Sequence, residues 1–460
     1  MKTLFKPCFV ALFILTVAVA PGFAVGFKTV LYTGSGATQS VTGVGFKPDL
    51  VWIKSRTPAS HHQLYDSIRG AGNILYPSAS LAEAYYSNQL TGFDNNGFTV
   101  GSGEAVNQLN QTFVAWCWKA DHTGITNANQ TERYSSESGL SIIKFSGDGI
   151  TGRALQHSLG AKPKMVIVKS TTDVVEWAVY HESLGATDYV FLNTTQGTNS
   201  ASTVWNDTEP SSSVVTLGNW HGVNMSGRDY IAYIFSEVPG ISSFGTYTGN
   251  GNAVGPIVDF GFEPAFLMVK QVNSTGHWLM YDNKRDSQNP NTHTLWANLS
   301  NAENTNNAHI NLIGTGFQLV TISPDVNASG GQYVYMAFAD LSFDQSGVFS
   351  VDGKIGVGVI NPTDELEVKG TIKSQEVIVT TDPQEWPDYV FDKNYRLRSI
   401  KDLNSYIQTN RRLPGIPTAE QLSESGIPVS EILKMQMQKI EELTLYIIEQ
   451  DRRINELQAQ

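Results

Sequence analysis

The sequence reads Gly45-Phe-Lys-Pro-Asp-Leu-Val-Trp-Ile-Lys54, and two later stretches follow the same pattern, Gly160-Ala-Lys-Pro-Lys-Met-Val-Ile-Val-Lys169 and Gly261-Phe-Glu-Pro-Ala-Phe-Leu-Met-Val-Lys270. In each stretch four apolar residues precede the lysine, which predicts a strand with both faces buried. The proline can begin such a strand without losing a ladder hydrogen bond, and we expect the lysine to end it at the surface. A further strand is predicted to end at a shared tyrosine, which is Tyr65, Tyr180 or Tyr281.

Other residues keep fixed distances from these three stretches. A Gly-x-Gly turn precedes each stretch, and a Val-Asn pair follows it, ending at Asn107, Asn224 and Asn327. Six residues after each asparagine comes an aromatic residue followed by Val or Ile. Anchors at fixed offsets in three places indicate an internal repeat, longer than the 20–50 residues of solenoid proteins.

We therefore predict a mainly β fold with three tandem β-sandwich-like repeats. Their expected bounds are 27–120, 142–238 and 242–341. The polar stretch 121–141 is interpreted as a linker between the first two repeats.

The composition agrees with this fold class and excludes others. Of the 460 residues 41% are hydrophobic and only 16% are charged, and glycine is abundant with 41 residues. These values argue against disorder and against a mostly helical enzyme. The net charge of −12 disfavours a nucleic-acid partner, because phosphate binding needs positive charge.

Residues 1–24 have the pattern of a secretory signal peptide. Two lysines precede an apolar run, and small residues lead up to a cut after Ala24. The run is too short to span a bilayer comfortably, so we expect a secreted or cell-surface protein with no membrane span after signal removal. The mature chain would keep one cysteine, Cys117, which is expected to be a buried thiol.

One repeated position could carry chemistry. The residue after the shared tyrosine is Asp66, His181 or Asp282. Its type changes between repeats and no paired carboxylate recurs beside it, so we interpret it as a turn residue that closes the strand. The sequence contains no nucleotide-binding, zinc-protease or serine-hydrolase motif. We predict no catalytic residue, no metal site and no cofactor.

Tryptophans offer a second kind of candidate, because an aromatic face can stack on a sugar ring. We consider a cell-surface glycan platform formed by some of Trp205, Trp220 and Trp296. The alternative for each of them is a place in the core.

The last third of the chain has a different character. Residues 342–384 alternate apolar and small residues and predict a short-strand, fibre-like segment, and residues 385–427 predict a small helical adaptor with N-caps at Ser399 and Thr418. Residues 428–460 predict a C-terminal α-helical coiled coil that joins copies of the chain as a homotrimer or homodimer. Its apolar a and d positions are Leu433, Ile440, Leu443, Ile447, Ile454 and Leu457, and Gln436 and Gln450 take the other d positions. The alternative is an amphipathic helix folded onto its own chain.

Three C-terminal motifs carry a resemblance. Ile355-Gly-Val-Gly-Val-Ile-Asn-Pro362, Leu413-Pro-Gly-Ile-Pro417 and Lys439-Ile-Glu-Glu-Leu443 resemble the fibre-like ends of bacterial surface proteins, which look like phage tail fibres. That resemblance implies export, trimeric assembly and an adhesive or structural role. The repeats look like a β-rich domain of phage tail-associated structural proteins, on motifs such as Val114-Ala-Trp-Cys-Trp-Lys119. This second resemblance implies a structural or binding role.

Together these observations favour an exported, fibre-like structural or adhesion protein that presents repeated β domains for surface or glycan binding. A secreted carbohydrate-binding protein is the second hypothesis. A secreted polysaccharide depolymerase is the third, and it needs a pair of carboxylates in a cleft.

Overall fold

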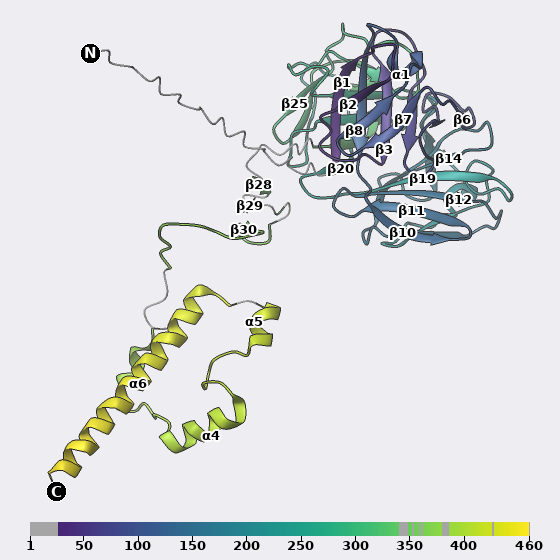
Figure 1. Cartoon of the computed structure of the whole chain (residues 1–460). Helices are drawn as coiled ribbons and strands as arrows, with labels where there is room; N and C mark the ends of the chain where they lie inside the picture. Colours follow the sequence, from purple (N-terminus) through teal and green to yellow (C-terminus); the bar gives the residue numbers. More distant parts are fainter. Residues whose placement is uncertain are drawn as a thin grey trace, which may run out of the picture. The chain divides into compact units, whose positions relative to one another are not determined.

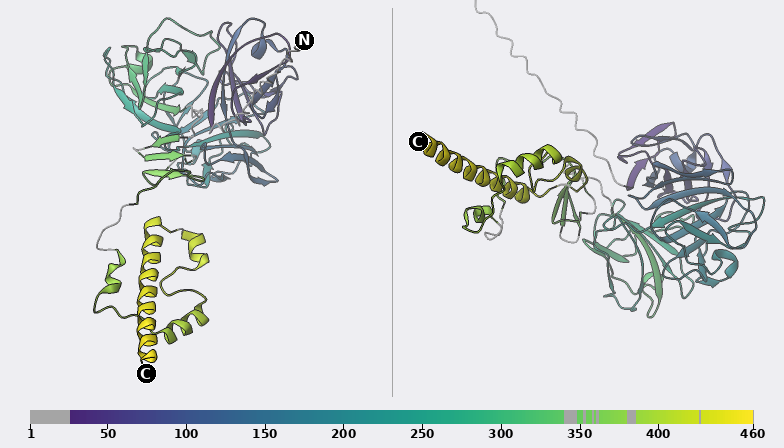
Figure 2. Two further views of the ribbon diagram at one scale, coloured as in Figure 1. Left: turned by 60° about the vertical axis from the view of Figure 1, so that its left-hand side comes forward. Right: turned by 90° about the horizontal axis from the view of Figure 1, so that it is seen from below.

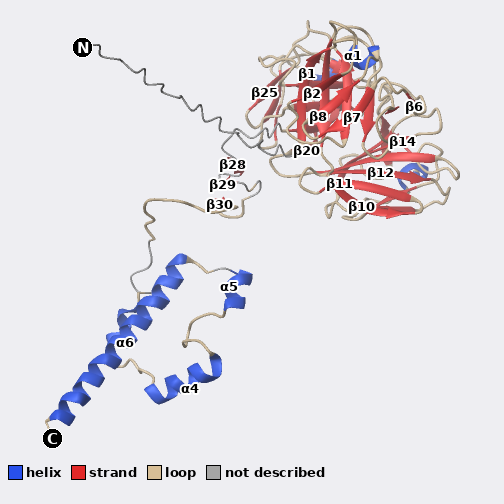
Figure 3. Cartoon of the chain, viewed as in Figure 1, coloured by secondary structure: helices blue, strands red, loops and turns tan. Residues whose placement is uncertain are grey.

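The computed structural model of the chain describes residues 26–339, 348–351, 354–357, 359, 362–379, 386–425 and 427–459 (Figure 1). The chain divides into two compact units, Met1–Gly370 and Thr371–Gln460. Strands dominate the first unit and helices the second (Figure 3). The chain is therefore mainly β and ends in a helix, as predicted. The predicted signal peptide lies outside the described residues.

Three antiparallel sheets form the body of the first unit, and one strand order recurs in all of them. In each segment the first strand pairs with the last strand. The last strand also pairs with the strand of the ten-residue pattern, and this strand pairs in turn with the strand of the shared tyrosine. In the first sheet these are β1 (Phe27–Thr33), β9 (Thr112–Trp118), β3 (Leu50–Ser55) and β4 (Gln63–Asp66). In the second they are β12 (Leu140–Ser146), β19 (Asp229–Ser236), β14 (Pro163–Ser170) and β15 (Ala178–His181). In the third they are β20 (Ser242–Thr248), β27 (Gln332–Phe338), β22 (Phe266–Gln271) and β23 (Trp278–Asp282).

Shorter strands extend two of these sheets. The second sheet continues through β16 (Asp188–Phe191) and β17 (Asn199–Ser200), and the third ends with β24 (Leu295–Trp296). A separate two-stranded ribbon, β5 (Asn73–Ile74) and β6 (Ala84–Tyr85), follows β4.

Each pattern strand is buried on both faces because two different cores contact it. Successive side chains of a strand point to opposite faces. In β3, Leu50 and Trp52 join a core shared by all three sheets, whereas Val51 and Ile53 join a core of their own segment. The same division occurs in β14 and β22. The apolar runs in the sequence are therefore explained by cover on both sides.

A small sheet covers the outer face of each main sheet. The first is β2 (Gln39–Thr42), β8 (Gly97–Val100) and β7 (Leu90–Asp94), the second is β13 (Arg153–Gln156) and β18 (Val214–Leu217), and the third is β21 (Ile257–Asp259), β26 (Gly316–Leu319) and β25 (Ile310–Ile313). Apolar side chains from each small sheet lie in the core of the same segment. One-turn helices precede the last main strands: α1 (Glu104–Asn107), α2 (Ser202–Trp205) and α3 (Pro324–Asn327).

The repeated asparagine fixes the repeated Gly-x-Gly turn. Asn224 is fully buried; its Oδ1 accepts from the Asp148 amide (3.0 Å), and its backbone oxygen accepts from the Gly149 amide (3.0 Å). Asn107 and Asn327 make the same two bonds to their own turns. A Cβ added to Gly147 would lie 2.2 Å from the Met225 oxygen, so only glycine fits there.

The stretch 121–141 is not a plain linker. It contains β10 (His122–Asn127) and β11 (Gln130–Ser135), a hairpin that adds two strands to the edge of the second sheet. The stretch is polar because this edge faces solvent, not because it lacks structure. Glu132 anchors the hairpin: its buried carboxylate accepts four hydrogen bonds, from the Ile125 and Ser158 amides and the Ser141 and Ser158 hydroxyls, at 2.7–2.8 Å.

Within the predicted fibre-like segment, β28 (Val348–Val351), β29 (Lys354–Val357) and β30 (Leu366–Val368) form one small sheet. The second unit contains a 3-10 helix η2 (Pro387–Phe391) and the helices α4 (Ile400–Asn410), α5 (Ala419–Ser425) and α6 (Val429–Gln458) (Figure 2). Ser399 caps α4 and Thr418 caps α5, as predicted. None of the helices in the described ranges is long and apolar enough to cross a membrane.

Candidate functional site

The position after the shared tyrosine closes a turn in all three segments. Asp66 Oδ1 accepts from the Arg69 amide (2.8 Å), Asp282 Oδ1 accepts from the Arg285 amide (2.7 Å), and His181 Nδ1 accepts from the Ser183 amide (3.2 Å). This is the turn role that the sequence predicts.

The same three side chains also reach the neighbouring segment. Tyr233 Oη of the second segment donates to Asp66 (2.8 Å), and Trp116 Nε1 of the first donates to Asp282 (3.1 Å). His181 Nε2 lies 3.2 Å from the Tyr335 oxygen of the third segment. Each segment is thus bound to the next, and the third is bound back to the first, so these residues close a ring.

Burial determines the protonation states of the side chains that link the three segments. Burial raises the pKa of Tyr233 well above its ordinary value and lowers the pKa of His181 to about 4. The His181 ring is therefore neutral near pH 7, and neither group is poised to exchange a proton with a substrate.

Two buried arginines each bind one of the linking aspartates together with a second carboxylate. Arg69 binds Asp66 (2.5 Å) and Glu83 (3.0 Å), and Arg285 binds Asp282 (2.5 Å) and Glu303 (2.8 Å). Burial opposes the charge of Arg69, but Asp66, Tyr233 and Glu83 together outweigh it and raise the pKa of the guanidinium. A carboxylate pair held by an arginine inside the protein is a structural ion pair, and it does not provide the open acid and base that a depolymerase needs.

A second set of contacts also joins neighbouring segments. Trp177 Nε1 of the second segment donates to the backbone oxygens of Tyr76 (3.2 Å) and Ala79 (3.0 Å) of the first. Trp278 Nε1 of the third segment donates to the Phe191 oxygen of the second (2.9 Å). The equivalent residue of the first segment is His62.

His62 and its neighbour His61, which directly precede β4, lie in different surroundings. His62 is fully buried and accepts from Trp52 Nε1 (2.8 Å), whereas His61 is exposed and bonds Ser78 (2.9 Å). The two imidazoles do not form a metal pair.

The repeated lysines are buried, and the prediction that they lie at the surface is wrong. Lys54, Lys169 and Lys270 have no exposed surface, and each ammonium donates to backbone oxygens. Lys270 bonds Gly276 (2.6 Å) of its own segment and Thr195 (3.0 Å) of the second. Burial lowers the pKa of each lysine to about 8. Their role is to satisfy backbone oxygens of the following loops.

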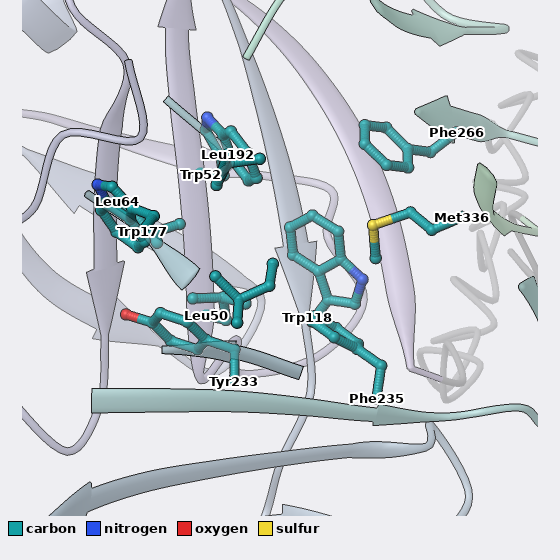
Figure 4. A pocket seen from close by; sticks show the side chains of 11 residues that line it. Leu50, Trp52, Leu64, Trp118, Trp177, Leu192, Tyr233, Phe235, Phe266 and Met336 are labelled. Carbon is teal, nitrogen blue, oxygen red and sulfur yellow. The ribbon is translucent and has the colours of Figure 1, made fainter. Parts of the chain in front are cut away.

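The core between the three segments leaves little room for a ligand. An apolar cavity of about 20 Å³ lies among side chains of all three segments. Figure 4 shows the side chains that line it, including Trp52, Trp177 and Phe266. That volume holds one water at most, and an apolar lining keeps such a cavity dry.

Cys117 is buried in the first segment, and burial raises the pKa of its thiol, so it is unreactive, as expected.

The structure separates the three candidate tryptophans of the glycan platform. Trp205 is 1% exposed and lies in the core of the second segment, so it presents no face to solvent. Trp220 is half-buried on that core, with its ring centroid 5.7 Å from that of Phe191 and 6.4 Å from that of Tyr189. Trp296 is half-buried on the core of the third segment. Trp205 is therefore excluded from the platform, and Trp220 and Trp296 remain candidates.

One exposed cluster was missed by the sequence analysis. Asp121, His122 and Glu137 bring three possible metal ligands within 4.8 Å of one another on the β10–β11 hairpin. All three side chains are exposed, and Lys119 pairs with Asp121 at 2.8 Å. We interpret them as solvated surface charges.

The second unit presents an apolar stripe on α6. All six predicted a and d side chains are exposed, by 42–69%. They are Leu433, Ile440, Leu443, Ile447, Ile454 and Leu457.

The chain itself covers a different face of α6. The segment around η2 contacts this helix: Tyr395 Oη donates to Glu442 (2.5 Å), Tyr446 Oη donates to the Arg398 oxygen (2.5 Å), and Glu441 is buried. In the heptad these α6 residues occupy positions c, g and b. The a and d stripe therefore has no cover from the described residues of its own chain.

Comparison with known proteins gives one match. A family model described as "Domain of unknown function (DUF7483)" matches residues 25–341. Neither a curated protein nor a solved structure matches the chain. The matched residues coincide with the three sheets and their small covering sheets.

Proposed function

The chain belongs to the DUF7483 family, and from this premise we propose that it is an exported, fibre-like structural and adhesion protein that assembles with copies of itself. The three segments act as β-sandwich-like modules of one family domain, joined into a single rigid body. The C-terminal helix α6 gathers chains into a homotrimer or homodimer by forming a coiled coil.

The exposed stripe of α6 carries this proposal. Isolated helices gain little stability from their own hydrogen bonds, and most helices in proteins depend on packing of an apolar face. The apolar face of α6 repeats every seven residues over 30 residues, which is the pattern of a coiled coil. Since the segment around η2 contacts positions b, c and g, the a and d side chains remain available to partner helices.

Light scattering of the full-length protein tests the assembly. We expect a dimer or trimer at micromolar concentration and a monomer for Ile447→Lys, because a charge at an a position cannot be buried in the seam. Asn455→Lys, at an exposed residue outside the a and d positions, is the matched control and should assemble like the wild type. A monomeric wild type would refute the proposal.

A secreted carbohydrate-binding protein without fibre assembly is the second candidate. The half-buried ring of Trp220 beside Tyr189 and Phe191 favours it, since such groups bind sugars by stacking. Deletion of 428–460 distinguishes the two: glycan binding as a monomeric module survives it, whereas adhesion by many weak contacts is lost with the assembly.

A further inference from the structure

Two neighbouring tyrosines stand apart from the other aromatic residues of the body. Tyr85 is 66% exposed and Tyr86 is 47% exposed. All other Phe, Trp and Tyr side chains described in 26–339 are buried or half-buried. The fold places almost every aromatic ring in a core, so these two require another explanation.

The fold itself does not need an aromatic residue at this place. Tyr85 lies in β6 and pairs with Asn73 of β5. In the second segment the corresponding pair is Ser200 with Asp188, and both Asn73 and Asp188 stand 25 residues after the pattern proline. A serine thus closes the same ribbon in the second segment, and the tyrosine in the first is free to serve another purpose.

The Tyr85 ring packs against Gly72. A Cβ added to Gly72 would lie 2.7 Å from Tyr85 Cε2, so a side chain at this position would collide with the ring. Gly72 also has φ +82°, a conformation that favours glycine. Although it packs against this glycine, the Tyr85 side chain is 66% exposed and is accessible to a ligand.

The ribbon that carries the tyrosines is fixed at both ends. The Tyr86 amide donates to the Gly72 oxygen (2.9 Å), and the Glu83 amide donates to the Thr171 oxygen of the second segment (2.9 Å). Tyr76, which hydrogen-bonds Tyr86, has its backbone oxygen bound by Trp177. A surface ordered in advance loses little entropy when it binds a ligand.

The chemistry around the rings is polar and uncharged. Ser87 and Asn88 follow the tyrosines and are exposed, and they can exchange hydrogen bonds with hydroxyl groups. The only charged residue from 76 to 89 is Glu83, which Arg69 neutralises. Two tyrosines beside exposed polar residues form no broad apolar patch of the kind that a protein partner buries.

We propose that the β5–β6 ribbon is a carbohydrate-binding site in which Tyr85, and to a lesser extent Tyr86, stack on pyranose rings of a neutral polysaccharide. This inference rests on the proposed adhesive function and names the binding site for it. The site occurs once per chain, so assembly through α6 would bring two or three copies together and convert weak single contacts into avid binding.

Affinity electrophoresis of the full-length protein tests this site. Native gels contain laminarin, mannan or xylan as neutral polysaccharides, or alginate as an anionic one. We expect at least one neutral polysaccharide to retard the wild type, and Tyr85→Ser to raise the apparent dissociation constant about tenfold or more. The serine is the residue that the second segment tolerates, so the variant should fold, which its thermal unfolding curve verifies.

Two further variants sharpen the test. Tyr85→Phe keeps the ring and should retain most of the binding, and Leu81→Ala removes an exposed apolar side chain (44% exposed) of the same loop and should bind like the wild type. The site is refuted if no neutral polysaccharide retards the wild type, if only alginate does, or if Tyr85→Ser binds unchanged. Light scattering reports assembly independently, so failure of the site and failure of the assembly are distinguishable.

Discussion

At the scale of single residues, the ring contacts show which roles a sequence reveals. The turn made by Asp66 with the Arg69 amide involves residues three apart, so a local pattern predicts it. The bond from Tyr233 to the same carboxylate joins residues 167 apart, and nothing near either residue signals it. The burial of Lys270 has a similar cause, because one of the oxygens that it satisfies belongs to another segment.

Trp177 and Trp205 provide a matched pair of buried tryptophans. Trp177→Phe leaves the Ala79 oxygen of the first segment without its donor, and the Tyr76 oxygen keeps only the bond from the Ala79 amide. Trp205 Nε1 has no partner among the described residues, so Trp205→Phe removes an unsatisfied group. We expect Trp177→Phe to lower the free energy of unfolding by about 1–3 kcal/mol more than Trp205→Phe does. Urea unfolding followed by circular dichroism measures the difference; equal losses would show that the indole bonds contribute nothing.

The buried lysines should make stability depend on pH above neutrality. The pKa of Lys270 falls from its ordinary 10.5 to about 8 in the folded chain, so the unfolded chain binds this proton more tightly. The free energy of unfolding should therefore rise as the pH increases from about 8 towards 10. Lys270→Met should reduce this rise in urea midpoints, and Lys144→Met, at an exposed position, should leave it as in the wild type. A midpoint that is flat or falls over this range in the wild type would contradict the assignment.

At the scale of elements, the sequence predicts the buried strands better than the polar segments that connect or flank them. The double-sided apolar runs identified β3, β14 and β22 correctly, because burial on both faces leaves a direct mark on composition. The hairpin β10–β11 left no such mark, since an edge that faces solvent has the polar composition of a loop. Trp205 could not be separated from Trp220 and Trp296 in the sequence, because a core position and a surface position select the same residue type.

Glu132 should be the residue on which this hairpin depends. Glu132→Gln keeps the shape of the side chain but replaces an oxygen by a donor that faces amides and hydroxyls, so at least one of the four hydrogen bonds becomes a clash of donors. We expect a loss of about 2–3 kcal/mol in the free energy of unfolding. The control is Glu137→Gln, which changes an exposed carboxylate (62%) on the same hairpin and should have little effect. Faster amide exchange across β10 and β11 would locate the damage; unchanged exchange and stability in Glu132→Gln would refute it.

At the scale of the whole molecule, one core joins all three sheets of the body. Trp118 of the first segment contacts Phe235 of the second and Phe266 of the third, with ring centroids 6.5 and 5.9 Å apart. The sequence predicts three similar segments, each a sandwich with a core of its own. The pattern strands in fact have a second apolar face, and this face is buried only when all three segments are present.

The body should consequently unfold in a single step. Glu303 of the third segment binds Arg56 of the first (2.8 Å) and also Arg285 (2.8 Å), and it is 5% exposed, so Glu303→Gln weakens a buried link where the ring closes. Breaking a buried ion pair costs about 3–5 kcal/mol. In scanning calorimetry we expect one transition for the body, which the variant shifts down by several degrees without splitting it. If the segments were independent, the variant would instead separate a low-temperature peak for the third segment from an unchanged peak for the other two, and the shared core would then not couple them.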